Sequence, residues 1–315
     1  MKFKKKALIM KVFVTGGNGF IGQVVVKTLI EHGHEVLALA HSDHSAQQLT
    51  QAGATPVKGS LDDLDGLSTA AKSSDGVIHL AFTNDFNHYD EAVAKDMAAV
   101  KALGDALANT DKPLVNTSGT LMAVGMGRTA TEQDHMAHPV GRAASEALAL
   151  SYAQQGVRAS VVRLAPTVHD IQRQGFGSIL AQMAVNHGKI GYVGDGANVW
   201  PSVHRNDAAQ LFVAALENGE AGATYNAVAE EGVPVKTIVE TIGNTLRVPV
   251  EHFDEETAKA YFGWFEPTVV GSNPTSSTWT QAALDWHPHE TGLLDDLKTC
   301  LSTPANVAAL QQPRN

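Results

Sequence analysis

Cysteine is almost absent from this chain, since Cys300 is the only one among 315 residues. A single thiol can form no disulfide within the chain, and a cysteine-rich zinc site is excluded as well. The segment around it, LKTCLSTP, indicates a buried, unreactive thiol rather than a nucleophile. The 14 histidines show no H-E-x-x-H or comparable spacing. We therefore expect no metal site.

The chain also lacks a basic surface and a long apolar run. Its formal net charge is −10, and the only basic run is KFKKK near the N-terminus. Proteins that bind nucleic acids need cations to neutralise phosphates, so we expect no nucleic-acid partner. No segment approaches the ~18 to 20 consecutive apolar residues of a membrane-spanning helix. We expect a cytoplasmic protein with no membrane partner.

The N-terminus superficially resembles a signal peptide because a basic start precedes an apolar stretch. Lys11 interrupts that stretch, and cleavage would remove the first predicted strand. We interpret Met10 as the natural start and residues 1–9 as an extension.

Apolar strands and helical segments alternate through the first half of the chain. Examples are KVFVT, GQVVVKTLIEHG and HEVLALA, with comparable pairs continuing to RASVVRLAP. Strands separated by helices of this length require right-handed crossovers and a parallel sheet covered on both faces. The sequence predicts an α/β fold, with a doubly wound Rossmann domain over residues 10–168. Residues 169–315 are predicted to form a smaller substrate-binding lobe, interleaved with the first domain.

A glycine-rich turn follows the first strand in VFVTGGNGFIG, residues 12–22. Glycines allow the backbone to approach a pyrophosphate, and the positive end of the following helix holds its charge. The spacing fits G-x-G-x-x-G from Gly17 or G-x-x-G-x-x-G from Gly16. Either reading predicts a nicotinamide dinucleotide site.

The end of the second strand indicates which dinucleotide binds. Sites that prefer NAD carry an acidic side chain there for the ribose 2′-hydroxyl, but this chain has Ala40 followed by His41 and Ser42. Histidine and serine can donate hydrogen bonds to a 2′-phosphate, which an acid would repel. NADP(H) is therefore favoured over NAD, although Asp43 follows closely.

The chain resembles the extended and atypical short-chain dehydrogenases/reductases over nearly its whole length. The residues that carry the resemblance are TGGNGFIG (15–22), GSLDDLD (59–65), HLAFT (79–83), NTSG (116–119), VVRLAPTVH (161–169) and WPSVHRNDAA (200–209). It is most similar to the atypical subgroup with H-x-x-x-R in place of the family's Y-x-x-x-K. Together with the turn and strand-end residues, the resemblance implies a cofactor site of Thr15, Gly16, Gly19, Phe20, Ile21, Gly22, His41, Ser42, Ser60, Leu61, Leu80, Ala81, Phe82, Arg142, Pro166 and Val168.

The segment HPVGR places His138 and Arg142 where the family has tyrosine and lysine. Glu146 supports this register because extended members commonly carry a glutamate four residues after the lysine. The resemblance implies that Ser118 or Thr120 is the catalytic hydroxyl, and both remain candidates. On a helix, residues four apart face the same way, so we expect His138 and Arg142 to point together.

Histidine can replace tyrosine as proton donor because its reference pKa of ~6.5 lies near working pH. Arginine can hold ribose hydroxyls but cannot shuttle protons. A nearby cation disfavours the imidazolium, which Glu132 or Asp134 could oppose. The alternative for His138 is an ordinary surface residue at a helix start, where Pro139 occupies the first turn.

Other candidates lie on the substrate side. Phe86, Trp200 and Arg205 are substrate candidates, with Arg205 alternatively in an ion pair with Asp207. Several large apolar residues could either line the substrate site or belong to the core: Phe82, Phe86, Met122, Phe176, Trp200 and Trp264.

These patterns predict an NADP(H)-dependent oxidoreductase, of the carbonyl reductase or alcohol dehydrogenase type, for a small and mostly apolar carbonyl compound. The alternatives are a cofactor-binding regulator without turnover and a sugar-nucleotide epimerase or dehydratase. The resemblance also implies a homodimer formed through two long helices, near residues 90–110 and 142–155.

If His138 donates the proton, turnover in the reductive direction falls as the pH rises through the ordinary titration range of histidine, about 5 to 7, because only the imidazolium can donate. Initial rates of NADPH oxidation with a competent carbonyl substrate, recorded from about pH 5 to 9, measure this dependence. A flat profile would rule out His138 as the acid.

Overall fold

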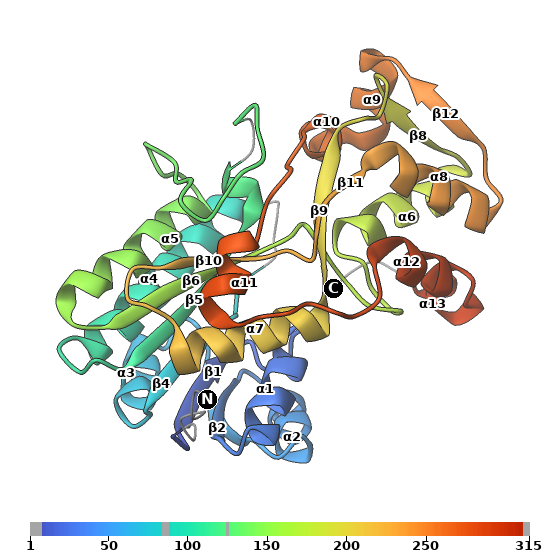
Figure 1. Cartoon of the computed structure of the whole chain (residues 1–315). Coiled ribbons are helices and arrows are strands. Elements are labelled where there is room, and N and C mark those ends of the chain that lie inside the picture. The colour runs from blue at the N-terminus through green and yellow to red at the C-terminus, as the bar shows by residue number, and fades with distance from the viewer. Residues whose placement is uncertain (1–7, 84–87, 124–125, 311–315) are drawn as a thin grey trace, which may run out of the picture.

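A seven-stranded parallel sheet forms the centre of the larger part of the molecule (Figure 1). The computed structural model describes residues 8–83, 88–123 and 126–310. The strand order is β10-β6-β5-β4-β1-β2-β3. The strands are β1 (Lys11–Thr15), β2 (Glu35–Ala40), β3 (Thr55–Lys58), β4 (Gly76–His79), β5 (Pro113–Gly119), β6 (Arg158–Leu164) and β10 (Thr224–Ala227). The predicted doubly wound α/β fold is confirmed.

Helices cover both faces of this sheet, as the sequence pattern predicts. One face carries α1 (Gly22–Glu31), α2 (Asp43–Gln51) and α7 (Arg205–Asn218), and the other carries α3 (Leu64–Lys72), α4 (Tyr89–Leu107) and α5 (Arg142–Ser151). The apolar side chains of α1 and α7 form one core with Val12 and Val14. Those of α3 and α4 form a second core around Phe13. Strands buried on both faces explain the nearly continuous apolar runs.

A smaller lobe lies to one side of the large sheet, at the upper right in Figure 1. Its strands are β7 (Thr167–His169), β9 (Val199–His204) and β11 (Glu230–Pro234) in one sheet, and β8 (Ile190–Val193) and β12 (Val250–Phe253) in another. Its helices are α6 (Phe176–His187), α8 (Val235–Leu246), α9 (Glu255–Phe262), α10 (Glu266–Val270), α12 (Leu293–Leu301) and α13 (Pro304–Leu310). The lobe has its own apolar core.

The chain passes more than once between the larger part and the smaller lobe. The predicted boundary after residue 168 falls inside β7, and the chain later returns to the large sheet through α7 and β10. It returns again at α11 (Thr278–Leu284), which contacts both α7 and β10. Each part is therefore built from discontinuous segments.

Cys300 is buried, as predicted, with 2% of its surface exposed. Burial raises the pKa of its thiol and so disfavours the reactive thiolate. In the part of the chain that the structure describes, no helix combines the length and apolar character needed to span a bilayer.

Candidate functional site

The glycine-rich turn between β1 and α1 brings backbone atoms unusually close together. Gly16 has φ +73°, a conformation that disfavours side chains, and a Cβ there would lie 2.7 Å from the amide nitrogen of Ala81. A Cβ on Gly22 would lie 2.0 Å from the carbonyl oxygen of Gly16. The amide of Gly19 closes the turn by donating to the same oxygen at 2.9 Å. The turn leaves the N-terminus of α1 free to hold an anionic group.

Thr15 connects the ends of β1 and β4 instead of facing outward. Its buried hydroxyl lies 2.7 Å from Nδ1 of His79 and accepts a hydrogen bond from the amide of Ala81 at 3.2 Å. Leu80 donates its amide to the Thr15 carbonyl, and Phe82 follows at the same edge. The predicted cofactor residues 80–82 thus lie directly beside the glycine-rich turn, whereas Phe86 lies outside the described residues.

A lysine that sequence reasoning missed lies at the end of β2. Lys58 on β3 is in register with Ala40, and its Nζ lies 2.7 Å from Oδ1 of Asp43. Ser42 caps α2, where its hydroxyl accepts the amide of Ser45. His41, Ser42 and Lys58 are all exposed beside Ala40. Only the β2–β3 register places Lys58 here, and no local motif marks it.

The adenine-side candidates follow β3. The Ser60 hydroxyl accepts the amide of Asp62 at 3.2 Å, and Leu61 packs against the core formed with α3 and α4. Both residues stand at the carboxyl edge of the parallel sheet, where nucleotides bind in doubly wound folds.

Arg142 is a partly buried cation at the carboxyl end of β5, and its Nε is fully buried. Its Nη2 donates to the carbonyl oxygen of Thr117 at 2.6 Å, and the guanidinium lies 4.1 Å from the centre of the Phe82 ring. Burial lowers the pKa of Arg142, and the charge of Asp96 opposes that shift. Its buried Nε has no hydrogen-bond partner among the described residues. The group remains a cation with a free donor.

Asp96 on α4 is the acidic counterpart of this cation. Its Oδ1 lies 3.2 Å from Nε2 of His79, while its buried Oδ2 has no partner among the described residues. Burial alone would raise the pKa of Asp96, but the hydrogen bond from His79 and the charges of His79 and Arg142 lower it overall. Thr15, His79, Asp96 and Arg142 therefore form one buried polar network. Sequence reasoning missed its two middle members.

His138 does not lie on a helix with Arg142, so the expectation that one helix carries both residues was wrong. α5 begins at Arg142, and its N-cap residue Gly141 has φ +55° and ψ −134°. This turn ends the irregular segment that carries His138, whose side chain is exposed. A spacing of four residues positions two side chains together only within a helix.

The two acids considered as neighbours of His138 have other partners. The Glu132 carboxylate accepts the amide and the hydroxyl of Thr280. Asp134 pairs with Arg128 and accepts the amide of Thr131. Neither acid is thus available to stabilise the imidazolium of His138.

Glu146 instead pairs with Arg163 and lies next to His135. The Nε of Arg163 donates to both carboxylate oxygens of Glu146, and Nδ1 of His135 lies 3.4 Å from Oε1. Burial would raise the pKa of Glu146, but these partners lower it to about 2. Glu146, the acid that supports the H-x-x-x-R register, is therefore the partner of Arg163 in a buried ion pair.

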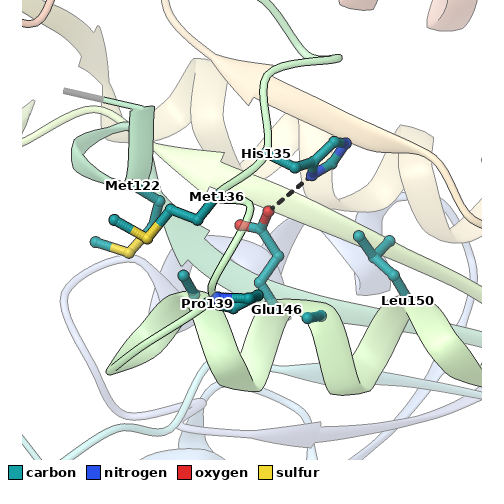
Figure 2. Close-up of a pocket in the computed structure, with 8 residues that line it drawn as sticks. Met122, His135, Met136, Pro139, Glu146 and Leu150 are labelled. Atoms are coloured by element: carbon teal, nitrogen blue, oxygen red, sulfur yellow. Dashed lines mark ion pairs between the residues drawn. The ribbon is translucent and has the colours of Figure 1, made fainter. Parts of the chain in front are cut away.

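A pocket of about 240 Å³ lies beside α5 (Figure 2). In Figure 2, Met122 and Met136 lie at one end, Leu150 at the other, and Glu146 faces His135 between them. The lining is mostly apolar and comprises Met122, His135, Met136, Pro139, Ala143, Glu146, Ala147 and Leu150. His138 belongs to the same loop as three of these residues.

The two hydroxyl candidates differ in their partners. Thr120 donates its hydroxyl to Oδ1 of Asn273 at 2.7 Å, and its carbonyl accepts Nδ2 of Asn273. The buried Ser118 hydroxyl lies beside Glu146, whose pKa it helps to lower, but it makes no hydrogen bond of ordinary geometry among the described residues.

The remaining substrate candidates are less accessible than the sequence suggested. Trp200 is 0% exposed and packs against Phe176 and Phe265, so it is a core residue of the smaller lobe. Arg205 pairs with Asp170 at 2.9 Å and not with Asp207. Pro166 lies between β6 and β7, and Val168 is the buried central residue of β7.

The proposed apolar wall is not a single surface. Phe82 lies near Tyr89 and Arg142, Met122 lines the pocket, and Phe176 belongs to the smaller lobe. Trp264 is 60% exposed. Packing in the core of the smaller lobe therefore explains Phe176 and Trp200.

Among the residues that the structure describes, His32, His34 and Glu217 form a cluster of metal-ligand residue types outside the site. Nδ1 of His34 accepts the backbone amide of Met10 at 3.1 Å, so its Nε2 must carry the proton that it shares with Glu217 at 3.0 Å. A protonated nitrogen cannot coordinate a metal. The cluster is therefore explained by hydrogen bonds that join α1 and β2 to α7.

A family model described as the NAD dependent epimerase/dehydratase family matches residues 12–228. An uncharacterized protein of Schizosaccharomyces pombe is 45% identical over 289 residues, covering 91% of this chain and 98% of that protein. The 2-alkyl-3-oxoalkanoate reductase of Stenotrophomonas maltophilia is 28% identical over 76% of this chain and 77% of its own length. The structure of a UDP-glucose 4-epimerase from Thermotoga maritima, with UDP-glucose, matches with a TM-score of 0.71 at 18% identity and covers 93% of this chain and 97% of that one.

Replacing Glu146 with Gln should leave Arg163 buried without its counter-charge and lower the free energy of unfolding at neutral pH by about 3–5 kcal/mol. The pKa of Glu146 is about 2 in the fold against an ordinary 4.5, so its contribution is complete above about pH 4.5 and is lost as the pH falls toward 2. Urea unfolding of both proteins between pH 7 and about 3 measures the difference.

Glu31→Gln is the control, because Glu31 is an exposed acid paired with Lys27. That variant should differ little from the wild type at any pH. A difference between wild type and Glu146→Gln that stays constant with pH would contradict the assignment.

Proposed function

The chain belongs to the NAD-dependent epimerase/dehydratase family, and we propose that it is an NADP(H)-dependent reductase of a small, mostly apolar ketone or aldehyde. The observation that carries this proposal is the partly buried cation Arg142 at the carboxyl edge of the sheet, next to the glycine-rich turn. A buried, pre-positioned guanidinium with an unpaired Nε suits the hydroxyls of a nicotinamide ribose.

In the proposed reaction the cofactor supplies a hydride to the carbonyl carbon, and the chain must supply a proton to the resulting oxygen. The backbone of residues 16–22 holds the pyrophosphate, and Arg142 holds the ribose. Ser118 polarises the carbonyl, because its hydroxyl makes no hydrogen bond of ordinary geometry among the described residues, whereas Thr120 donates to Asn273 at 2.7 Å. His138 donates the proton from its exposed segment when the substrate is bound.

The preference for an apolar substrate rests on the pocket beside α5. Its lining is mostly aliphatic and thioether side chains, and it lies under the segment that carries His138. Thioether side chains adapt to irregular apolar ligands. The similarity to the Stenotrophomonas maltophilia 2-alkyl-3-oxoalkanoate reductase supports the same substrate class.

The preference for NADP(H) rests on charge at the end of β2. Asp43 pairs with Lys58, which is in register with Ala40, and the nearby carboxylate of Asp63 accepts the amide of Gly66. A 2′-phosphate here would meet a cation and the donors of His41 and Ser42. An unpaired acid, which favours NAD, is missing from this position among the described residues.

The exposure of His138 favours a second candidate function. A protein that binds the dinucleotide without turnover needs Arg142 and the glycine-rich turn, but it needs no proton donor. The similarity in fold to the UDP-glucose 4-epimerase leaves a sugar-nucleotide enzyme as a further alternative, which thermal protection by UDP or GDP ligands would favour.

The proposal predicts NADPH oxidation with at least one member of a panel of aliphatic ketones, 3-oxo acids and aldehydes. Arg142→Ala, Ser118→Ala and His138→Ala should each lower kcat/KM by about 100-fold or more, since each removes a group that acts at the reacting centre. Thr120→Val is the matched control for Ser118→Ala and should retain most activity. Binding of NADPH without turnover on the whole panel would favour the regulator.

Direct titration should show tighter binding of NADPH than of NADH. Lys58→Ala should weaken NADPH about tenfold, or ~1.4 kcal/mol, and leave NADH nearly unchanged, because only NADPH has the 2′-phosphate. Lys27→Ala is the control, since Lys27 is also an exposed, ion-paired lysine. Equal binding of both cofactors by the wild type would refute the NADP(H) assignment.

A further inference from the structure

Two arginines from distant parts of the chain meet at the glycine-rich turn. We propose that Arg173 and Arg205 form a cationic clamp that binds the diphosphate of the dinucleotide from the side opposite the turn. This inference rests on the proposed function only in taking a dinucleotide as the ligand.

Both guanidinium groups lie on the ring of Phe20, which belongs to the turn itself. The Cζ of Arg205 is 5.0 Å from the ring centre, and that of Arg173 is 5.5 Å from it. Phe20 directly precedes Ile21, the N-cap residue of α1. The two cations therefore lie beside the backbone that is expected to receive the diphosphate.

Asp170 pairs with the side chain of Arg205 and binds the backbone of Arg173. Its buried carboxylate pairs with Nε of Arg205 through Oδ2 and accepts the amides of Gln172 and Arg173 through Oδ1. Its own amide donates to the Arg173 carbonyl at 2.8 Å, and the buried Gln174 side chain donates to the Asp170 carbonyl. Hydrogen bonds thus fix the backbone of segment 170–174, and the exposed Arg173 side chain reaches from it to the Phe20 ring.

The charges at this position do not balance. Two cations converge on one ring, and Asp170 compensates one of them. Nε of Arg205 lies 2.9 Å from Asp170 but makes no hydrogen bond of ordinary geometry among the described residues, and the Arg173 side chain is exposed. Two cations beside one ring repel each other, and an anion that binds both offsets this repulsion. In a chain of net charge −10, this is a local excess of positive charge that an anionic ligand would satisfy.

A diphosphate fits this arrangement in both charge and geometry. Guanidinium groups bind phosphate oxygens through paired donors, and backbone amides at the N-terminus of α1 can bind the opposite oxygens. The other source of such an anion is an acidic group on the substrate. Proximity to Phe20 and the turn favours the cofactor, and the experiment separates the two.

The test measures Kd for ADP, NADPH and adenosine by calorimetry with the wild type, Arg173→Gln and Arg205→Gln. Each substitution should weaken ADP and NADPH by about tenfold and adenosine by less than about twofold, because adenosine lacks the diphosphate. Arg205→Lys keeps the charge beside Asp170 and should recover part of the loss. Arg247→Gln, which removes an exposed arginine at the end of α8, is the matched control.

Equal weakening of ADP and adenosine, or no weakening of ADP, would overturn the clamp. Unchanged ADP binding with a raised KM for 3-oxo acids, but not for neutral ketones, would assign the arginines to the substrate and also overturn it. If the panel shows no turnover while ADP binding depends on both arginines, the clamp stands and the reductase proposal fails. If turnover occurs and the Kd for ADP is unchanged by both arginine substitutions, only the clamp proposal fails.

Discussion

Burying the guanidinium of Arg142 is the constraint on which the rest of the site depends. A cation removed from water needs compensation, and here that comes from the Thr117 carbonyl, the Phe82 ring and the charge of Asp96. Asp96 in turn requires His79, and His79 requires Thr15. The ends of β1, β4 and β5 are therefore joined to α4 and α5 by one polar network. The glycine-rich turn begins directly at its edge.

The sequence predicted the elements with local signals. Alternating strands and helices identified the doubly wound sheet, and the glycine spacing identified the turn at Gly16 and Gly22, where added Cβ atoms would collide with backbone. The H-x-x-x-R register around Arg142, inferred from its spacing to Glu146, stays a prediction. These features depend on neighbouring residues along the chain, so a single sequence contains the information.

The features that sequence reasoning missed depend on tertiary register. Lys58 reaches the end of β2 only because β3 pairs with β2, and Arg163 meets Glu146 only because β6 lies under α5. The placement of His138 was wrong for a related reason, because Gly141 starts the helix later than the Y-x-x-x-K pattern implies. The backbone conformation of Gly141 therefore separates His138 from the helix that carries Arg142.

The return of β10 to the large sheet has a consequence for how this molecule could be divided. β6 pairs with β5 on one side and with β10 on the other, and α7 covers the face beneath them. A fragment ending at residue 168 would keep β6 but lose β10 and α7. The loss of β10 would leave an unpaired strand edge in water, and the loss of α7 would expose an apolar face of the sheet. The cofactor-binding half is therefore not an independent module, and any recombination with relatives should exchange the discontinuous pieces together.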